Sequence, residues 1–387
     1  MKKKIAILGS TGSIGKTLLN IVNKDYKKFE IILLSANKDY KTLIAQAKKF
    51  KVKKIIITNE NSFKIAKIKY SKSNIEIFNS FENLSRIIKK KIDYTMSSII
   101  GIDGLDPTLK IIKFTKKIAI ANKESIVCGW KLILKELKRY NTEFVPVDSE
   151  HFSLWYAMNN FKSNQIENFF LTASGGPFYN KPLNKFKNIK ISEALKHPNW
   201  NMGKKISIDS ATMINKVYEV IEAKNIFNIP YEKINILIHP RSYVHALIKF
   251  NNGMIKVIAH DTTMYIPIFN TLYFNINKKI NSKKLDINAL NNLSLEKISK
   301  KRYPMIKLLK RLPNKNSLFE TVIVSANDTL VDMFLKRKIK FLDIQKKLFK
   351  LINSNEFQKY KKISPKSVKD ILYLNNYVRL KINEKSV

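Results

Sequence analysis

The 387-residue sequence contains a single cysteine, Cys128. One cysteine forms no intramolecular disulfide, and it cannot supply a cysteine-based zinc or iron–sulfur centre. Long apolar runs are missing as well, because none approaches the ~18–20 residues of a membrane-spanning helix. The apolar stretch at residues 5–8 is too short for the core of a signal peptide. We therefore expect a soluble, cytoplasmic protein with no membrane partner.

Arginine and acidic residues are scarce relative to lysine. The chain has 72 Lys+Arg against 30 Asp+Glu, a net charge of +42, yet only seven of the basic residues are arginine. Proteins that read bases rely on bidentate arginine, and single-strand binders place aromatic residues among their basic ones, which these lysine runs seldom do. Because isoleucine and asparagine are abundant too, AT-rich codon usage accounts for the lysines. We expect no nucleic-acid partner, and a lysine-rich nucleic-acid-binding protein is the alternative from another functional class.

Glycine is rare, with ten residues, where an average share of about 7% would give roughly 27. The glycines that remain should mark positions that a side chain would obstruct. Six of them lie in loops that also carry chemically active side chains, at residues 9, 12, 15, 175, 176 and 203.

The order of apolar runs predicts an α/β protein of three domains and a linker. In residues 1–147 short apolar runs alternate with amphipathic stretches, which predicts a Rossmann-like domain. Residues 148–275 hold all five histidines and several strand-like runs, and predict an α+β catalytic domain. Residues 276–300 are polar and predict a linker, and the glycine-free residues 301–387 predict a small helical domain. The strands expected in the first domain lie at residues 4–8, 30–36, 53–58, 94–99 and 117–122.

A glycine-rich turn follows the first predicted strand. Gly9, Gly12 and Gly15 have the spacing GxxGxxG, a variant of a nucleotide fingerprint, and a helix is expected to begin near Ile14. Backbone amides at such a helix start can hold a pyrophosphate. After the second strand, where NAD proteins carry an acid, residues 37 and 38 are an amide and a lysine that suit a 2′-phosphate. NADP is therefore favoured, and a tight turn followed by an ordinary polar loop is the alternative.

Two acids stand two residues apart behind a strand-like run. If the strand continues, Asp148 and Glu150 point to one side and begin a site for a hard divalent cation. The equal alternative is a helix N-terminus capped by Asp148 or Ser149. Further on, Ser210 is expected to open a helix in which Asn215 and Glu219 share a face.

Side chains around that helix suit a phosphate and a metal. A hydroxyl, an amide and the Lys216 ammonium suit a phosphate oxyanion, and Glu219 could reach the metal. The alternative for Lys216 and Glu219 is an exposed ion pair.

Three more loops carry candidate residues. Ser174 precedes two glycines and offers a second phosphate contact. The loop from His197 to Gly203, within a lid expected at about residues 194–204, has one large aromatic side chain, although a lone tryptophan is often a packing anchor. Polar residues 122–125 follow a buried strand, where they either face a ligand or cap a helix.

Taken together, these motifs resemble one family, the 1-deoxy-D-xylulose 5-phosphate reductoisomerases of non-mevalonate isoprenoid biosynthesis. The most specific blocks, HPNW and DSATM, lie within HPNWNMGKKISIDSATMINK (197–216), and PVDSEH (146–151) matches as well. The other matching stretches are ILGSTGSIG (7–15), ANKES (121–125), SGGPF (174–178), EVIEA (219–223), IHPRSYVH (238–245) and, more loosely, SANDTLVDMFL (325–335).

The resemblance implies a homodimeric oxidoreductase and isomerase that uses NADPH and Mg²⁺ or Mn²⁺, with Co²⁺ as a further candidate. Such an enzyme rearranges 1-deoxy-D-xylulose 5-phosphate and reduces the intermediate to 2-C-methyl-D-erythritol 4-phosphate. The implied metal ligands are Asp148, Glu150 and Glu219. The implied acid–base residues are Lys123 and Glu150. The implied substrate-binding residues are Lys123, Ser149, Glu150, Ser174, His197, Ser210, Asn215, Lys216 and Glu219, with Trp200 and Met202 in the lid. The NADPH-binding candidates are Thr11, Gly12, Ser13, Ile14, Asn37, Lys38, Asn122, Glu124 and Gly203.

The sequence departs from the usual family pattern at three places. Asn37 stands where a glycine is usual and Asp39 where an amide is usual, next to the expected 2′-phosphate. The loop at residues 262–265 reads Thr-Thr-Met-Tyr instead of Pro-Asp-Met-Arg, and Arg241 replaces a glutamine. None of these changes touches the metal set. Another NADP-dependent sugar-phosphate dehydrogenase is the alternative within enzymes.

Overall fold

The computed structural model describes residues 2–274, 276 and 278–384. Packing divides these residues into two compact units. Unit 1 comprises the chain up to residue 125 together with residues 131–148 and 264–279, and unit 2 comprises residues 126–130, 149–263 and the chain from residue 280. The three-domain division remains a prediction, and its residues 1, 275, 277 and 385–387 lie outside the described residues.

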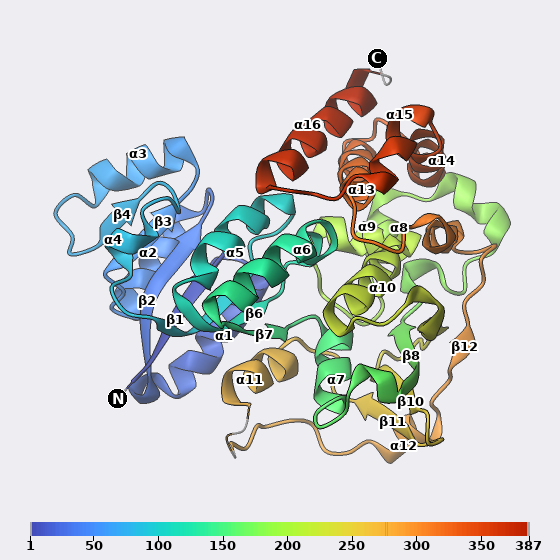
Figure 1. The fold of residues 1–387 in the computed structure, drawn as a ribbon, viewed down its shortest axis with the longest axis horizontal. Helices are drawn as coiled ribbons and strands as arrows, with labels where there is room; N and C mark the ends of the chain where they lie inside the picture. Colours follow the sequence, from blue (N-terminus) through green and yellow to red (C-terminus); the bar gives the residue numbers. More distant parts are fainter. Residues whose placement is uncertain (1, 275, 277, 385–387) are drawn as a thin grey trace. The chain divides into compact units, whose positions relative to one another are not determined.

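Unit 1 contains a seven-stranded sheet in which every pairing is parallel (Figure 1). The strand order β4-β3-β2-β1-β5-β6-β7 reverses its direction of winding at β1, the position where doubly wound sheets bind nucleotides. The Rossmann-like prediction is thereby confirmed. The strands are β1 (Lys3–Leu8), β2 (Phe29–Ala36), β3 (Lys54–Ile57), β4 (Glu76–Phe78), β5 (Ile92–Ser97), β6 (Thr115–Ile120) and β7 (Glu143–Pro146).

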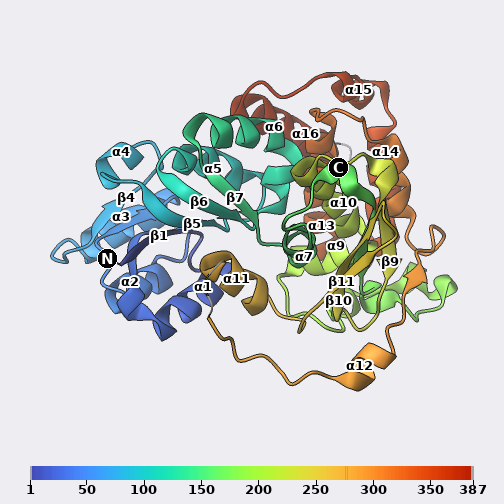
Figure 2. The ribbon, with the colours of Figure 1, turned by 60° about the horizontal axis from the view of Figure 1, so that its bottom comes forward.

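Helices connect these strands, as parallel pairing requires. They are α1 (Ser13–Lys24), α2 (Tyr40–Lys49), α3 (Glu60–Lys69), α4 (Leu84–Ile87), α5 (Leu105–Ile112) and α6 (Lys123–Tyr140). A late segment, α11 (Tyr265–Tyr273), returns to lie beside α1 (Figures 1 and 2). There the Tyr273 hydroxyl donates to Asp25 at 2.6 Å, and the Lys24 ammonium donates to Tyr265 at 3.2 Å.

Unit 2 is built on a five-stranded mixed sheet of order β11-β10-β8-β9-β12. Only β8 and β9 are parallel, and the other pairings are antiparallel. The helix α7 packs on β10, so the α+β prediction for this region is confirmed. The strands are β8 (Ile166–Ala173), β9 (Ile234–Ile238), β10 (Val244–Phe250), β11 (Ile255–Ala259) and β12 (Glu296–Lys297). The nearby helices are α7 (Ser149–Ala157), α8 (Ile191–Ala194), α9 (Lys204–Thr212), α10 (Ile214–Phe227) and α12 (Ile287–Asn291).

The C-terminal region of unit 2 is helical, as predicted. Its centre is α13 (Phe319–Leu335), which is buried over most of its length and packs against α14 and α16. The other helices are α14 (Phe341–Ile352), α15 (Asn355–Gln358) and α16 (Val368–Glu384). Short 3₁₀ segments are η1 (Tyr26–Lys28), η2 (Ile102–Gly104), η3 (Ser163–Gln165), η4 (Gly176–Phe178), η5 (Leu183–Asn188), η6 (Tyr231–Lys233), η7 (Pro304–Arg311) and η8 (Lys359–Lys362). Among the described helices, none has the length and apolarity that crossing a membrane requires.

Candidate active site

Three predicted ligands lie close together around the start of α7. Asp148 immediately precedes this helix, Glu150 is its second residue, and Glu219 lies in α10. One carboxylate oxygen from each residue lies within 4.8 Å of those from the other two. Three hard oxygen donors at this spacing suit Mg²⁺ or Mn²⁺. Metal binding by this trio remains a prediction, but its residues fit the ion.

The predicted alternation of the first two acids along a strand is wrong. The strand β7 ends at Pro146, and α7 begins at Ser149, so Asp148 and Glu150 do not alternate along a strand. The two acids instead flank the first residue of a helix. The helix-start alternative and the metal prediction are therefore compatible, because the same turn places both carboxylates.

Lys216 lies among these acids as a buried cation. Its ammonium group donates to Glu150 Oε1 at 2.7 Å, to Glu219 Oε2 and to the backbone carbonyl of Thr172. Burial alone would lower the pKa of Lys216, but the two carboxylates offset this effect and raise the pKa above its usual value. Lys216 is therefore a charged residue of the carboxylate group, and the exposed-pair alternative is wrong because the side chain is buried.

The segment from Ser210 to Glu219 forms parts of two helices. Ser210 lies in the last turn of α9, so the prediction that it opens a helix was wrong. Met213 adopts a left-handed conformation with φ of 68° and separates α9 from α10. In α10 the amide of Asn215 donates to Glu219 Oε1, which confirms the shared face. A phosphate contact for Ser210 and Asn215 remains a prediction.

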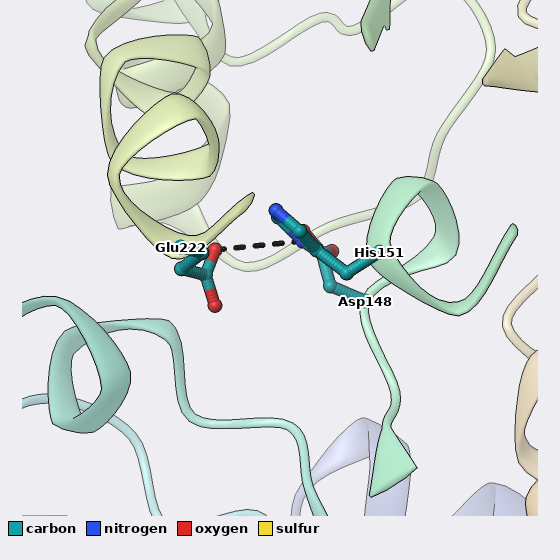
Figure 3. A group of neighbouring side chains, drawn as sticks. All are labelled: Asp148, His151 and Glu222. Carbon is teal, nitrogen blue, oxygen red and sulfur yellow. Dashed lines mark ion pairs between the residues drawn. The ribbon is translucent and has the colours of Figure 1, made fainter. Parts of the chain in front are cut away.

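A second group of side chains shares Asp148 with the trio and adds His151 and Glu222 (Figure 3). His151 in α7 is fully buried; its Nε2 lies 2.8 Å from the backbone oxygen of Glu219, and its Nδ1 lies 3.7 Å from Glu222 Oε2. Ligand atoms of Asp148, His151 and Glu222 also lie within 4.8 Å of one another. His151 thus connects α7 to α10 at the predicted ligand Glu219. Sequence reasoning assigned His151 and Glu222 no role, although both lie within family motifs.

The structure joins Ser174 and His197, the two predicted phosphate contacts from separate loops. His197 Nδ1 accepts the backbone N–H groups of Asn199 and Trp200 at 3.2 and 3.0 Å. Nε2 therefore carries the ring proton and donates to Ser174 Oγ at 3.0 Å. Burial lowers the pKa of His197 to about 4, so the ring is neutral near pH 7. Ser174 Oγ also accepts from the Gly176 amide at 3.0 Å, which leaves its own proton for a ligand.

The predicted lid loop is anchored at its start. The Asn199 amide donates to the Pro240 carbonyl at 2.6 Å and to Ser242 Oγ at 2.8 Å. The IHPRSYVH motif therefore holds this loop. Trp200 approaches the His245 ring edge-on, with centroids 6.2 Å apart, which is a packing contact. The lid function of Trp200 and Met202 remains a prediction.

Sequence reasoning also assigned no role to two histidines near this loop. The rings of His245 and His260 are stacked, with centroids 3.7 Å apart. His245 Nε2 lies 3.2 Å from the backbone oxygen of His260. Burial lowers the pKa of His245 to about 3, and it also lowers that of His260. Two neutral rings can stack in this way without charge repulsion, and only their spatial contact reveals the pair.

The glycine-rich turn leaves no room for a side chain at two of its glycines. Gly9 has φ of 83°, and a Cβ at Gly15 would lie 2.5 Å from Ser10 Cα. The helix α1 follows Gly12, and no side chain caps its first amides. These residues fit a dinucleotide, because bare amides at a helix start can bind phosphate oxygens. NADPH binding by Thr11, Gly12, Ser13 and Ile14 remains a prediction.

Residues 122–124 lie at the start of α6, where the sequence suggested either a helix cap or a ligand contact. Asn122 caps α6, since its side chain accepts from the Ser125 amide at 2.6 Å and donates to the Ile99 and Gly101 carbonyls. The cap alternative is correct for this side chain, so a cofactor contact would come from its backbone. Lys123 begins α6 and is buried, with its ammonium 2.9 Å from Asp148 Oδ2. Glu124 is also buried, and its NADPH contact stays a prediction.

Two of the three departures acquire a structural reason. Asn37, Lys38 and Asp39 are exposed after β2, and the Asp39 carboxylate accepts from the Thr42 amide at 3.1 Å as the N-cap of α2. That carboxylate is therefore engaged in capping. Thr262 donates to the Ser242 carbonyl at 3.2 Å, in the segment that anchors the lid loop. Nothing in the structure explains Arg241.

Comparisons with known sequences match the chain to the family that the motifs indicated. The family model of 1-deoxy-D-xylulose 5-phosphate reductoisomerase matches residues 5–129, and models of its C-terminal domains match residues 144–227 and 261–381. A relative from Pelagibacter ubique with this name is 58% identical over the full length of both chains. Another with the same name, from Clostridium novyi, is 38% identical over 99% of both chains.

Solved structures agree in fold. The reductoisomerase of Zymomonas mobilis in complex with NADPH has a TM-score of 0.87 and 31% identity, over 100% of this chain and 99% of that chain. A reductoisomerase in complex with NADPH, fosmidomycin and magnesium has a TM-score of 0.90 and 29% identity, over 99% of this chain and 98% of that chain. From the motifs, the folded site and these relatives together, the chain belongs to the 1-deoxy-D-xylulose 5-phosphate reductoisomerase family.

Proposed function

We propose that this chain converts 1-deoxy-D-xylulose 5-phosphate to 2-C-methyl-D-erythritol 4-phosphate, using NADPH and a divalent metal. The observation that carries the proposal is the trio of carboxylates, Asp148, Glu150 and Glu219, within 4.8 Å of one another. These residues would hold the metal. When bound, Mg²⁺ or Mn²⁺ supplies a Lewis acid that polarises the substrate carbonyl.

The side chains around the trio suit the proton transfers of a rearrangement. Lys123 Nζ, held by Asp148, is a donor that would contact the substrate hydroxyls. Glu150 offers a carboxylate as a base, and Ser149 Oγ donates to its Oε2 at 2.6 Å, which orients that group. Lys216 forms ion pairs with the carboxylates of Glu150 and Glu219.

Phosphate binding is assigned to the hydroxyl, imidazole and amide groups of unit 2. Ser174 keeps a hydroxyl proton to donate, because its oxygen accepts from His197 and Gly176. Neutral His197 orients that hydroxyl without adding charge. Ser210, Asn215 and Lys216 would complete the contacts, as the family resemblance implies. Trp200 and Met202 would exclude water above the substrate.

NADPH would bind in unit 1, where a glycine-rich turn opens α1. Lys38 is exposed after β2, where a cation would pair with the 2′-phosphate. Solved complexes of relatives with NADPH, and with NADPH, fosmidomycin and magnesium together, support this assignment. We also propose a cytoplasmic homodimer that works in isoprenoid biosynthesis, which rests on the family resemblance.

The direct test is NADPH oxidation with the sugar phosphate in the presence of Mg²⁺, Mn²⁺ or Co²⁺. We expect oxidation that requires both substrate and metal, with the rearranged methylerythritol phosphate as product. Oxidation that yields an unrearranged sugar phosphate would favour another NADP-dependent dehydrogenase. No oxidation by folded protein would exclude the proposed reaction.

A single substitution tests the metal set. Glu219→Gln removes one anionic ligand and should lower turnover by ~100-fold or more, because Lewis-acid stabilisation is worth several kcal/mol. NADPH affinity, measured by fluorescence, should stay unchanged. The matched control is Glu167→Gln, which alters an exposed pair with Lys249. Normal turnover by Glu219→Gln would remove Glu219 from the metal set.

A further inference from the structure

The loop of residues 174–181, here named the Ser174 loop, has an unusual backbone. Gly175 and Gly176 have successive positive φ values of 85° and 65°. A Cβ on Gly176 would lie 3.0 Å from the backbone oxygen of Ser210. The loop therefore passes directly against the end of α9 at Gly176, which brings its backbone next to another predicted phosphate residue, Ser210.

Two neighbouring side chains from near the start of η7 hold this loop. The Tyr303 hydroxyl donates to the Gly175 carbonyl at 2.8 Å, and Tyr303 is only 2% exposed. Arg302 Nη1 donates to the carbonyls of Phe178 and Lys181 at 2.8 and 2.7 Å. Three backbone carbonyls of the Ser174 loop thus accept hydrogen bonds from side chains that lie about 120 residues later in the chain.

The bond from Tyr303 fixes the direction of an amide as well. The Gly175 carbonyl and the Gly176 N–H belong to one planar trans peptide, so they point in opposite directions. While Tyr303 holds that carbonyl, the N–H points to the other side, where it donates to Ser174 Oγ at 3.0 Å. A flipped peptide would place a carbonyl beside Ser174 and break this bond.

The orientation of this peptide matters for the ligand-facing side of the loop. Ser174 Oγ accepts from both Gly176 and His197, so its proton is not used by either partner. Without the Gly176 bond the hydroxyl could rotate, and its proton could turn toward the loop. Glycine provides no steric barrier to such a rearrangement, because both glycines tolerate many φ and ψ values.

We propose that Tyr303 and Arg302 are positioning residues of the phosphate site, with Tyr303 setting the orientation of the Gly175–Gly176 peptide. This inference rests on the proposed function, in which Ser174 binds the substrate phosphate. The start of η7 then contributes to substrate affinity although neither side chain needs to touch the substrate. Arginine suits its place because one guanidinium nitrogen serves two carbonyls while the planar group stays rigid.

The test is Tyr303→Phe, which removes one hydroxyl and keeps the ring. We expect the KM for the sugar phosphate and the inhibition constant of inorganic phosphate to rise ~5- to 10-fold, as for the loss of one buried hydrogen bond. The dissociation constant of NADPH should not change. The matched control is Tyr377→Phe, which removes a hydroxyl bonded to Glu356 and should leave all three constants unaltered.

The measured constants decide whether Tyr303 positions the phosphate site. Unchanged phosphate constants in Tyr303→Phe, or an equal loss of NADPH affinity, would overturn the positioning role. If Tyr303→Phe does not fold, Arg302→Met takes its place, with the same phosphate-specific loss expected because methionine donates no hydrogen bond to the Phe178 and Lys181 carbonyls. If the wild type does not convert the sugar phosphate, the proposed function fails, and calorimetric binding of inorganic phosphate to both proteins still tests the role of Tyr303.

Discussion

At the scale of single residues, the surroundings of Lys216 and His197 determine whether each side chain carries a proton. Lys216 is buried, remains charged and bonds to two predicted metal ligands. A buried ammonium between carboxylates offsets their mutual repulsion, which a bound divalent cation would also do. Lys216 and the metal are therefore expected to contribute to the same electrostatic balance, and this overlap can be measured.

Lys216→Met removes the cation and leaves its carboxylate partners without it. We expect the free energy of unfolding to fall by about 3–5 kcal/mol, because one member of a buried ion pair is lost. Added Mg²⁺ should then raise the melting temperature of the variant more than that of the wild type. Thermal unfolding with and without Mg²⁺ checks this, with Lys249→Met in the exposed Glu167 pair as the control. Equal shifts in both proteins would contradict it.

His197 makes stability depend on pH in a defined direction. Its pKa is lowered from 6.5 to about 4 by burial. Between these values the unfolded chain binds a proton that the folded ring does not, so stability rises with pH across this window and falls as the solution is acidified. His197→Asn can still accept from the amides of residues 199 and 200, but it does not titrate.

We therefore expect a shallower pH dependence for His197→Asn than for the wild type between pH ~4 and ~6.5, and no difference in slope above that window. Urea unfolding at a series of pH values measures it. Parallel curves for the two proteins would show that folding does not lower the pKa of His197.

At the scale of elements, helix starts place much of the site. The turn before α1, the cap of α6 and the start of α7 each place a predicted residue at the end of a preceding strand. Gly15 permits the first of these turns, since a Cβ there would meet Ser10 Cα at 2.5 Å and the Gly9 oxygen at 2.6 Å. Gly12 has nothing closer than the Gly9 oxygen at 3.4 Å.

Gly15→Ala should therefore lower the free energy of unfolding by about 1–3 kcal/mol, the usual range for overpacking, and weaken NADPH binding. Gly12→Ala is the matched control for stability and should change it by only ~1 kcal/mol or less. Chemical unfolding and NADPH fluorescence titrations give both values. Equal stability of the two variants would mean that the backbone at Gly15 relaxes around the methyl group.

Sequence patterns predicted most elements of unit 1, because buried parallel strands are continuous apolar runs. The strand β4 escaped notice since it has three residues, none of them buried. The break at Met213 escaped too, because a left-handed methionine leaves no mark in the sequence pattern. Motifs identified the carboxylates and Ser174, whereas the bond from Tyr303 to Gly175 joins residues 128 positions apart, which no local pattern reveals.

At the scale of the whole molecule, the net charge of +42 has a kinetic consequence. The substrate and the coenzyme are both anions, and a positive field raises the rate at which they meet the protein. We expect kcat/KM to fall several-fold between ~0.02 and ~0.3 M salt, with kcat nearly constant, as screening shortens the Debye length. Steady-state kinetics in KCl measure this, and a salt-independent kcat/KM would contradict steering.

The net charge of +42 also provides a test of the nucleic-acid alternative, through the salt dependence of DNA binding. Non-specific binding to a DNA duplex should weaken steeply toward ~0.15 M salt, and it should not alter turnover there. Tight binding that persists at that salt would instead favour a nucleic-acid function. The seven arginines among 72 basic residues make persistent binding unexpected.

The return of α11 to α1 has a consequence for synthesis of the chain. Unit 1 takes its last segment from residues 264–279, where Thr271 bonds to Tyr94 of β5 at 2.8 Å and Tyr273 contacts Phe29 of β2. A ribosome releases the seven strands of that sheet long before it releases this helix. Unit 1 of the nascent chain must therefore remain incomplete, without α11, until more than a hundred further residues have emerged. Chaperone binding during translation should concentrate in that interval, before residue 279 leaves the exit tunnel.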